Sequence, residues 1–262
     1  MKARTAAAQM LPPLVTARLG WWKYLIVGEL EIHELARLLP ATGVAIDVGA
    51  NVGYYSNALK LLGLDVVSFE PDQTYRKRQT ALLGARARIE SAALSDANGE
   101  GVIRVPQTSS GDYGGSLGSL SQLAVPDDRV ASSYRTPLRT LDSYGFEGVV
   151  FIKIDVEGYE EAVLAGGMET LIRFKPLLLI EIEERHNPRG LERISKNLAV
   201  LGYEGFFYYE RKRRNLADFN PVVHQRIQDI ETSPRQYVNN FFWRAPDSPR
   251  HRLRNRSLWR EI

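Results

Sequence analysis

The chain has 262 residues, of which 44% are hydrophobic and none is cysteine, and its formal net charge is +3. This length and apolar content can supply a sizeable core, while the absence of cysteine excludes disulfides and thiolate metal sites. No apolar run approaches the roughly 20 residues that span a bilayer, and residues 1–15 lack the apolar centre of a secretion signal. We therefore expect a globular, cytoplasmic protein.

Apolar, β-type runs alternate with helix-like segments between residues 44 and 201. The expected strands are 44–48, 65–70, 87–94, 149–156 and 176–183, and the expected helices are 54–63, 71–84, a segment from about 159, and 190–201. This alternation is typical of a single α/β domain, with a parallel sheet covered by helices on both faces. Two aromatic runs, 203–210 and 237–245, predict an antiparallel pair that closes one edge of the sheet.

The two ends of the chain fall outside this alternation, which divides the sequence into residues 1–40, 41–246 and 247–262. The first part has apolar residues at helical spacing over 19–39, so it could pack against the sheet, cap the active site or pair with a second copy in a homo-oligomer. The last part is basic, with apolar residues interspersed, and could contact a membrane surface or an anionic glycolipid precursor. A solvated or disordered end explains the same composition.

The run VAIDVGANVGYYS, residues 44–56, ends a strand and opens a helix. Gly49 and Gly53 allow a sharp turn and a close approach to a ligand, but they do not follow the GxGxxG spacing of a dinucleotide loop. Asp47 would repel a pyrophosphate and suits a ligand with an ammonium or sulfonium group. Glu70 ends the next strand, where α/β nucleotide sites place an acid on ribose hydroxyls. Together these residues predict S-adenosylmethionine as cofactor; a tight turn beside a helix cap is the simpler interpretation.

Several motifs follow one another in a recognisable order. They are DVGANVGYYS (47–56), FEP (69–71), ALSD (93–96), FIKIDVEGYEEAVLAGG (151–167) and LLLIEIEERH (177–186). With them the chain resembles the FkbM-type family of S-adenosylmethionine-dependent methyltransferases over about residues 44–245, and KIDVEGYE is the most specific part. The resemblance implies a Rossmann-like class I methyltransferase fold, with a seven-stranded, mostly parallel sheet and one antiparallel edge strand. It also implies O-methylation of hydroxyls on sugars, polyketides or similar metabolites.

The same resemblance assigns the parts of the cofactor to residues of this chain. The loop after the first strand would surround the methionine part, Glu70 would hold the ribose, and Pro71, Leu94 and Ser95 would lie beside the adenine. Ser95 could equally be a turn former. The cofactor-binding residues expected on this basis are Asp47, Gly49, Ala50, Asn51, Gly53, Tyr54, Glu70, Pro71, Leu94, Ser95 and Asp155.

The block KIDVEGYE puts charged residues at the carboxyl end of a strand, where parallel sheets hold their sites. Lys153, Asp155 and Glu157 share one strand face, and two acids after a lysine are costly to bury without partners. We expect Asp155 to face the cofactor or the substrate and Glu157 to orient its neighbours. The structural alternative is a lysine–carboxylate pair that neutralises itself at the sheet edge.

The segment IEIEERHNP ends the following strand and would open into the same cleft. His186 could accept the proton of a substrate hydroxyl, since its unperturbed pKa is about 6.5, and Glu183 is the reserve base. A divalent metal on the acids and His186 is chemically feasible, but we expect metal-free catalysis because the sulfonium is already a strong electrophile. The expected catalytic residues are His186, Glu183, Asp155, Glu157 and Lys153, with no metal.

The glycine- and serine-rich segment 109–122 resembles a loop that closes over the site, although a plain flexible linker has the same composition. Gly114, Gly115 and Gly118 would supply hinge freedom, and Ser116 and Ser119 could hydrogen-bond a hydroxylated acceptor.

Three classes of function stay open at this point. The first is an O-methyltransferase with a small-molecule or glycan hydroxyl acceptor and no nucleic-acid partner. The second is an NAD-dependent oxidoreductase, against which Asp47 and the glycine spacing argue. The third is a noncatalytic cofactor-binding or scaffold protein, because a missing base would go unseen while the acceptor is unknown.

Overall fold

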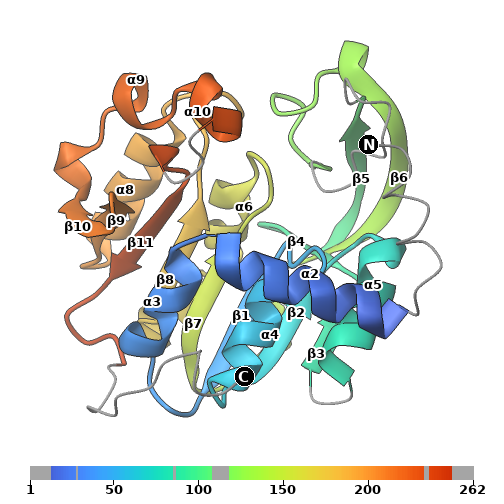
Figure 1. The fold of residues 1–262 in the computed structure, drawn as a ribbon, viewed down its shortest axis with the longest axis horizontal. Coiled ribbons are helices and arrows are strands. Elements are labelled where there is room, and N and C mark those ends of the chain that lie inside the picture. The colour runs from blue at the N-terminus through green and yellow to red at the C-terminus, as the bar shows by residue number, and fades with distance from the viewer. Residues whose placement is uncertain (1–12, 28, 85–86, 108–117, 233–235, 250–262) are drawn as a thin grey trace.

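The computed structural model describes residues 13–27, 29–84, 87–107, 118–232 and 236–249 (Figure 1). Its main feature is a large sheet with helices on both faces. The strands of this sheet are β1 (Val44–Val48), β2 (Asp65–Phe69), β3 (Ala87–Glu90), β7 (Val149–Ile154), β8 (Leu177–Glu181), β9 (Glu204–Tyr209), β10 (Lys212–Asn215) and β11 (Asn240–Arg244). They follow the order β10-β9-β11-β8-β7-β1-β2-β3. No helix in these ranges is long and apolar enough to cross a membrane.

The direction of the strands gives the sheet its Rossmann-like character. The neighbours β3, β2, β1, β7 and β8 are all parallel, while β11 pairs antiparallel with both β8 and β9. The α/β fold and the antiparallel pairing of the two aromatic runs, now β9 and β11, are therefore confirmed. The predicted order along the chain holds as well, since each expected strand of this sheet begins within three residues of its predicted position.

Two details of the sheet differ from the expectation of seven strands with one antiparallel strand at the edge. The sheet has eight strands, and the antiparallel strand β11 lies inside it. The additional edge strand, β10, arises because Glu210 and Arg211 both have positive φ, 49° and 62°, and join β9 to β10 as a two-residue turn. Such a turn matches the twist of a hairpin, so the chain folds back and pairs at once.

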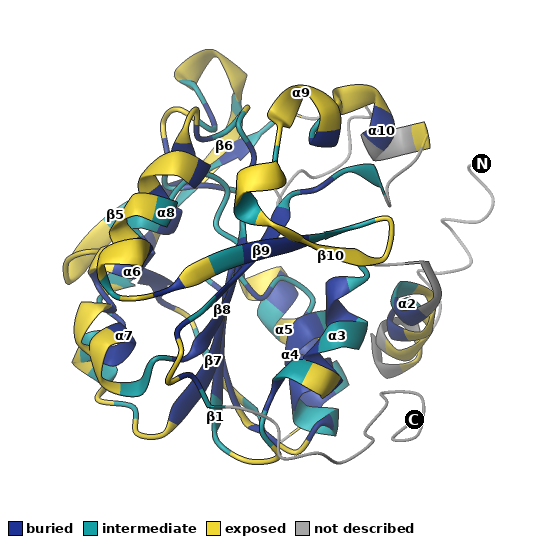
Figure 2. Cartoon of the chain, turned by 90° about the vertical axis from the view of Figure 1, so that its left-hand side faces the viewer, coloured by how far each residue is buried: buried dark blue, intermediate teal, exposed yellow. Residues whose placement is uncertain are grey.

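Alternating side chains of the inner strands build two apolar layers. Ile46 and Ile152 face one layer, and Ala45 and Phe151 face the other. Figure 2 shows these strands as the buried centre of the molecule. The first layer is covered by α6 (Glu160–Ala165), α7 (Met168–Phe174) and α8 (Gly190–Val200), and the second by α2 (Pro13–Val27), α3 (Glu31–Leu38) and α4 (Tyr54–Leu61). Two short helices, α9 (Pro221–His224) and α10 (Ile227–Thr232), connect β10 to β11.

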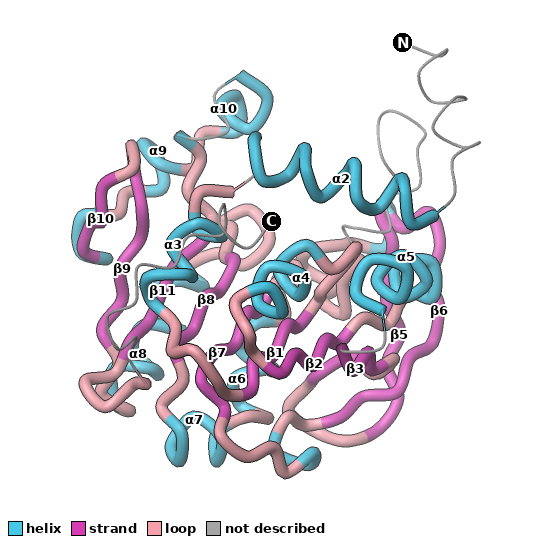
Figure 3. Tube along the Cα trace, turned by 60° about the horizontal axis from the view of Figure 1, so that its bottom comes forward, coloured by secondary structure: helices cyan, strands magenta, loops and turns pink. Residues whose placement is uncertain are grey.

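The segment 19–39, expected to be helical, contributes to α2 and α3. Trp21 and Leu25 of α2, and Ile32 and Leu35 of α3, are buried in the second apolar layer. Helix α2 runs across α4 and α5 (Gln73–Leu83), as Figure 3 shows. These helices therefore pack on the body of the fold, which is the first of the three roles considered for them; pairing with a second copy stays a prediction.

A smaller sheet was only partly predicted. It contains β4 (Ala93–Leu94), β5 (Gly99–Pro106) and β6 (Val130–Arg139) in the order β4-β6-β5. The expected strand 87–94 is divided between the two sheets, because the chain leaves β3 at Glu90 and enters β4 at Ala93. Strand β6 was not predicted, because its sequence VASSYRTPLR carries a proline and lacks an alternation of apolar and polar residues; in the structure most of the strand is exposed.

Candidate active site

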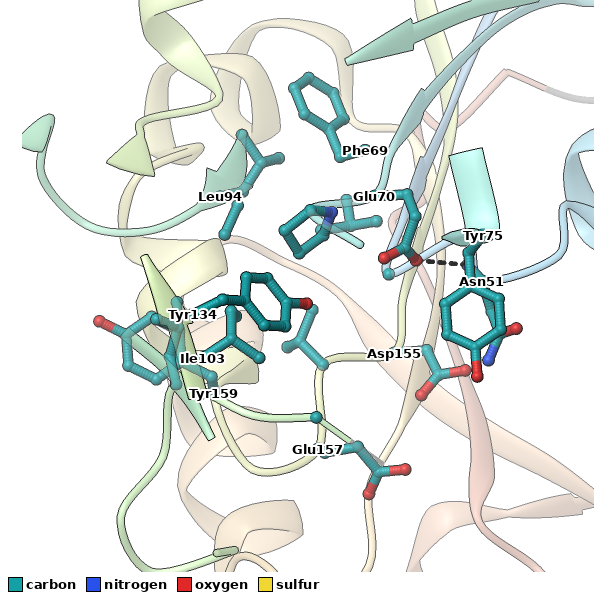
Figure 4. A pocket seen from close by; sticks show the side chains of 17 residues that line it. Asn51, Phe69, Glu70, Tyr75, Leu94, Ile103, Tyr134, Asp155, Glu157 and Tyr159 are labelled. Carbon is teal, nitrogen blue, oxygen red and sulfur yellow. Dashed lines mark hydrogen bonds between the residues drawn. The ribbon is translucent and has the colours of Figure 1, made fainter. Parts of the chain in front are cut away.

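A pocket of about 650 Å³, part of it open to solvent, lies at the carboxyl ends of β1, β2 and β7. This is the end of a parallel sheet at which α/β proteins bind their ligands. Figure 4 shows the carboxylates of Glu70 and Asp155 on one side of the pocket and the apolar side chains of Leu94 and Ile103 on the opposite side. A ligand held here would meet acidic groups at one end and an apolar surface at the other.

The turn after β1 is closed by its own backbone. The N–H groups of Gly49 and Ala50 both donate to the carbonyl oxygen of Phe69, at 3.0 and 3.1 Å, and Gly53 N–H donates to Ala50 O at 2.8 Å. A Cβ on Gly49, whose φ is +74°, would lie 1.8 Å from the carbonyl oxygen of Asp155, so only glycine lets this turn pack against the end of β7. The N–H groups of Gly49, Ala50 and Gly53 are thus occupied within the protein and are not free for a pyrophosphate.

Glu70 is a buried carboxylate in the pocket wall. Its Oε2 accepts a hydrogen bond from Asn51 N–H and its Oε1 accepts one from Asp72 N–H, both at 2.8 Å (Figure 4). Burial raises the pKa of Glu70 to about 7, against the lowering effect of these two bonds. Each carboxylate oxygen can still accept a second bond, so Glu70 can hold a ligand hydroxyl while it fixes the turn.

Asp155 also lines the pocket, and a buried lysine holds it from behind. Lys153 Nζ lies 2.8 Å from Asp155 Oδ2 and 4.7 Å from the centroid of the Tyr55 ring. Burial lowers the pKa of Lys153, but the carboxylates of Asp155 and Asp47 outweigh it and raise that pKa above its ordinary value. Lys153 is not part of the pocket wall, and its contact with the pocket is through Asp155.

Asp47 lies behind the pocket wall. Its side chain is fully buried, and its Oδ2 accepts a hydrogen bond from Ser56 Oγ at 2.6 Å. Burial raises the pKa of Asp47, while the charge of Lys153 opposes this. The structure therefore places Asp47 next to the lysine of the sheet and not at the surface that a ligand would touch.

The remaining predicted cofactor residues divide between the pocket and its surroundings. Tyr54 packs on α2, with its ring centroid 4.8 Å from that of Tyr24. Ser95 Oγ donates to Asp96 Oδ1 at 3.0 Å and lies 3.1 Å from the hydroxyl of Tyr159. The predicted residues that line the pocket are Gly49, Asn51, Glu70, Pro71, Leu94 and Asp155, and those that do not are Asp47, Ala50, Gly53, Tyr54 and Ser95.

Two of the predicted catalytic residues meet at the edge of the pocket. Glu157, in the turn after β7, lines the pocket, and its Oε2 lies 2.6 Å from His186 Nδ1. His186 belongs to the loop after β8. Burial opposes its protonation, but the contact with Glu157 outweighs burial and raises the pKa of His186 above its ordinary value. Glu183 is itself buried and forms an ion pair with Arg185, so it is less free to act as a base.

Sequence reasoning placed Leu94 of β4 in the site but missed the contribution of β5 and β6, the other two strands of the smaller sheet. Ile103 of β5 and Tyr134 of β6 line the pocket, and no signal could have placed them there because β6 was not predicted. Ser119, expected to bind the acceptor, is buried and donates to the carbonyl oxygen of Glu157 at 2.6 Å, so it stabilises the turn after β7. Gly114, Gly115 and Ser116 lie outside the described residues, and Gly118 lines the pocket. In the part of the chain that is described, no group of three His, Asp or Glu side chains is arranged to hold a metal ion.

The profile of the methyltransferase FkbM domain matches residues 47–208, which is more than half of the chain. The chain belongs to the FkbM methyltransferase family. Its cofactor is S-adenosylmethionine, and the pocket suits this molecule, because an acidic end and an apolar side match a cationic methionine part and an adenine.

Two relatives extend the comparison. The AMB antimetabolite synthetase AmbE of Pseudomonas aeruginosa is 29% identical over an alignment of 205 residues, and this alignment covers 64% of this chain and 10% of AmbE. The crystal structure of methyltransferase FkbM from Methylobacillus flagellatus KT superposes with a TM-score of 0.50 at 15% identity, over 91% of this chain and 57% of that one. The latter similarity shows a shared fold. The chain therefore spans about a tenth of AmbE and just over half of the Methylobacillus protein.

Proposed function

We propose that this FkbM methyltransferase is an O-methyltransferase whose acceptor is a hydroxyl of a sugar, a glycan or glycolipid precursor, or a polyketide-like metabolite. The observation that carries the proposal is the contact between His186 and Glu157 at the edge of the cofactor pocket. A hydroxyl is a weak nucleophile while it keeps its proton, so its methylation gains from a base that removes the proton as the new bond forms. A histidine held by a carboxylate is such a base.

Each side chain has a role in this proposal. Glu70 accepts hydrogen bonds from the ribose, Asp155 faces the positive methionine part, and Leu94 with Ile103 covers the adenine. S-adenosylmethionine, when bound, supplies an electrophilic methyl group on a sulfonium. The protein aligns the acceptor with that group and excludes water, and these effects provide much of the rate.

The Glu157–His186 pair would move the proton. Glu157 contacts Nδ1, which leaves Nε2 of the ring to take the hydroxyl proton, and the carboxylate stabilises the imidazolium that forms. The raised pKa of His186 agrees with this stabilisation. Glu157 thereby orients the base, which extends the role expected for it from the sequence.

The acceptor class is supported by the likeness to part of AmbE, whose description as an antimetabolite synthetase points to small-molecule chemistry. A nucleic-acid acceptor is not part of the proposal. A cytoplasmic location, a homo-oligomer and a contact of the basic tail with an anionic lipid surface also stay proposals; residues 250–262 of that tail lie outside the described structure.

The test is methyl transfer from labelled S-adenosylmethionine to paired acceptors that differ only in carrying a hydroxyl or an amine at the same carbon. We expect the label on oxygen of the hydroxylated member of a pair. Label on nitrogen or carbon would contradict the proposal, and binding of the cofactor without transfer to any acceptor would favour a noncatalytic role.

A further inference from the structure

The turn that carries Glu157 and the loop that carries His186 are joined by a second buried carboxylate. Glu160, the first residue of α6, is 1% exposed. Its Oε1 accepts a hydrogen bond from Gly158 N–H at 2.6 Å, and its Oε2 accepts one from Asn187 Nδ2 at 3.1 Å. One oxygen thus binds the residue after Glu157, and the other binds the residue after His186.

The backbone of the Glu157 turn needs such support. Glu157 and Gly158 have φ of +50° and +88°, a left-handed conformation that is unfavourable for a residue with a side chain. A Cβ on Gly158 would lie 2.9 Å from the carbonyl oxygen of His186, so the turn packs directly on the backbone of the histidine loop. The relative position of Glu157 and His186 is therefore set by how these two backbone segments are held together.

Burial of a carboxylate at this point is energetically unfavourable, because the charged group loses its contact with water. Burial raises the pKa of Glu160 to about 7, although the bonds from Gly158 and Asn187 oppose the change. An acid nearer the surface would serve the start of α6 equally well, and the half-buried Glu161 provides one, in an ion pair with Arg193. The buried position of Glu160 is thus explained by the link between the two segments and not by the helix.

We propose that Glu160 and Asn187 form a clamp, defined by these two side chains, that positions His186 against Glu157. They are positioning residues, because neither lines the pocket. The proposal rests on the proposed function for its effect on turnover, but the geometric part, the control of the His186–Glu157 contact, can be tested without any acceptor.

The decisive readout is the pKa of the His186 imidazole, measured by NMR and assigned by comparison with His186→Ala. Glu160→Gln and Asn187→Ala each break one half of the clamp, so in both variants the contact with Glu157 should loosen and the pKa of His186 should fall toward about 6.5. Neither substitution touches Glu183 or Arg185, the other charges that act on His186. Glu169→Gln, at an exposed position in the first turn of α7, is the matched control and should leave the pKa unchanged.

Turnover is the second readout. We expect kcat to fall on the order of tenfold to a hundredfold in both clamp variants, as misplacement of a reacting group does, with cofactor affinity unchanged. An unchanged His186 pKa in both folded variants would overturn the clamp. If the pKa of His186 falls in Glu160→Gln but not in Asn187→Ala, the clamp is also overturned, because the fall would then come from the lost charge of Glu160. Asn187→Ala removes no charge, so it tests the clamp even if Glu160→Gln fails to fold.

The clamp and the proposed function fail in different ways. If the His186 pKa falls in both variants while His186→Ala retains full turnover, the clamp stands and the base assignment is wrong. If His186→Ala is inactive but both clamp variants keep the wild-type pKa, the base assignment stands and the clamp is wrong.

Discussion

The single side chain of Glu70 both holds the turn after β1 and lines the pocket. We expect Glu70→Ala to weaken binding of S-adenosylmethionine by roughly 1.5 to 3 kcal/mol, the range for a hydrogen bond to a charged group. Isothermal titration calorimetry measures this directly. Asp65→Ala, at the exposed opposite end of the same strand, is the control, and equal affinities of both variants would remove Glu70 from the cofactor site.

Lys153 is the buried cation among the acids of the sheet. Lys153→Met would leave Asp155 and Asp47 without their positive neighbour, and loss of one partner of a buried pair costs about 3–5 kcal/mol of unfolding free energy. Urea unfolding checks this value. Lys196→Met, which breaks an exposed pair on α8, should have little effect; if both variants unfold at the same urea concentration, Lys153 has no structural role.

Prediction from the sequence succeeded for side chains that follow the end of a parallel strand and failed for side chains within a strand. Glu70 and Asp155 follow the ends of parallel strands, and such ends converge on a pocket wherever the fold is of this type. Asp47 and Lys153 are paired in register on adjacent strands, and both are buried below the pocket wall. The alternation along a strand shows that two residues share a face, but it does not show which face the ligand will meet.

At the scale of secondary-structure elements, the smaller sheet forms one wall of the pocket in which we propose that the cofactor binds. Tyr134 of β6 contributes its ring to that wall. We expect Tyr134→Ala to reduce cofactor affinity, by about 1.5–3 kcal/mol if the whole ring is covered on binding, because apolar contact is lost. Calorimetry tests this. Val102→Ala, an exposed change on β5, serves as control, and wild-type affinity in Tyr134→Ala would mean that β6 is not part of the cofactor site.

The elements that the sequence predicted well are those with strong apolar patterns. Strands β1, β7 and β8 are almost entirely buried, and their short, predominantly apolar sequences predict buried strands. Strand β6 and the short hairpin partner β10 are largely exposed and polar, so nothing in their composition distinguishes them from loops. The wall that β6 contributes therefore became visible only in three dimensions.

The whole molecule should be less stable at higher pH because it buries several carboxyl groups. Burial raises the pKa of Glu31 to about 8 and those of Glu70 and Glu160 to about 7, from 4.5. The native state thus keeps protons that the unfolded chain has released, so this stabilisation is complete below about pH 4.5 and is lost as the pH rises through about 7 to 8. Urea unfolding between about pH 5 and pH 8 should show a falling free energy, with a smaller slope in Glu31→Gln. A free energy that rises over this range would contradict the burial of these groups.

The proposed base, His186, lies against Glu157 at the edge of the proposed cofactor pocket. The most direct measurement is single-turnover methyl transfer to a hydroxyl acceptor at saturating S-adenosylmethionine, in the wild type and in His186→Ala. We predict that the substitution slows transfer by about a hundredfold or more and leaves cofactor affinity near the wild-type value, since His186 does not line the cofactor pocket. An unchanged rate of transfer would contradict the role of His186 as the base.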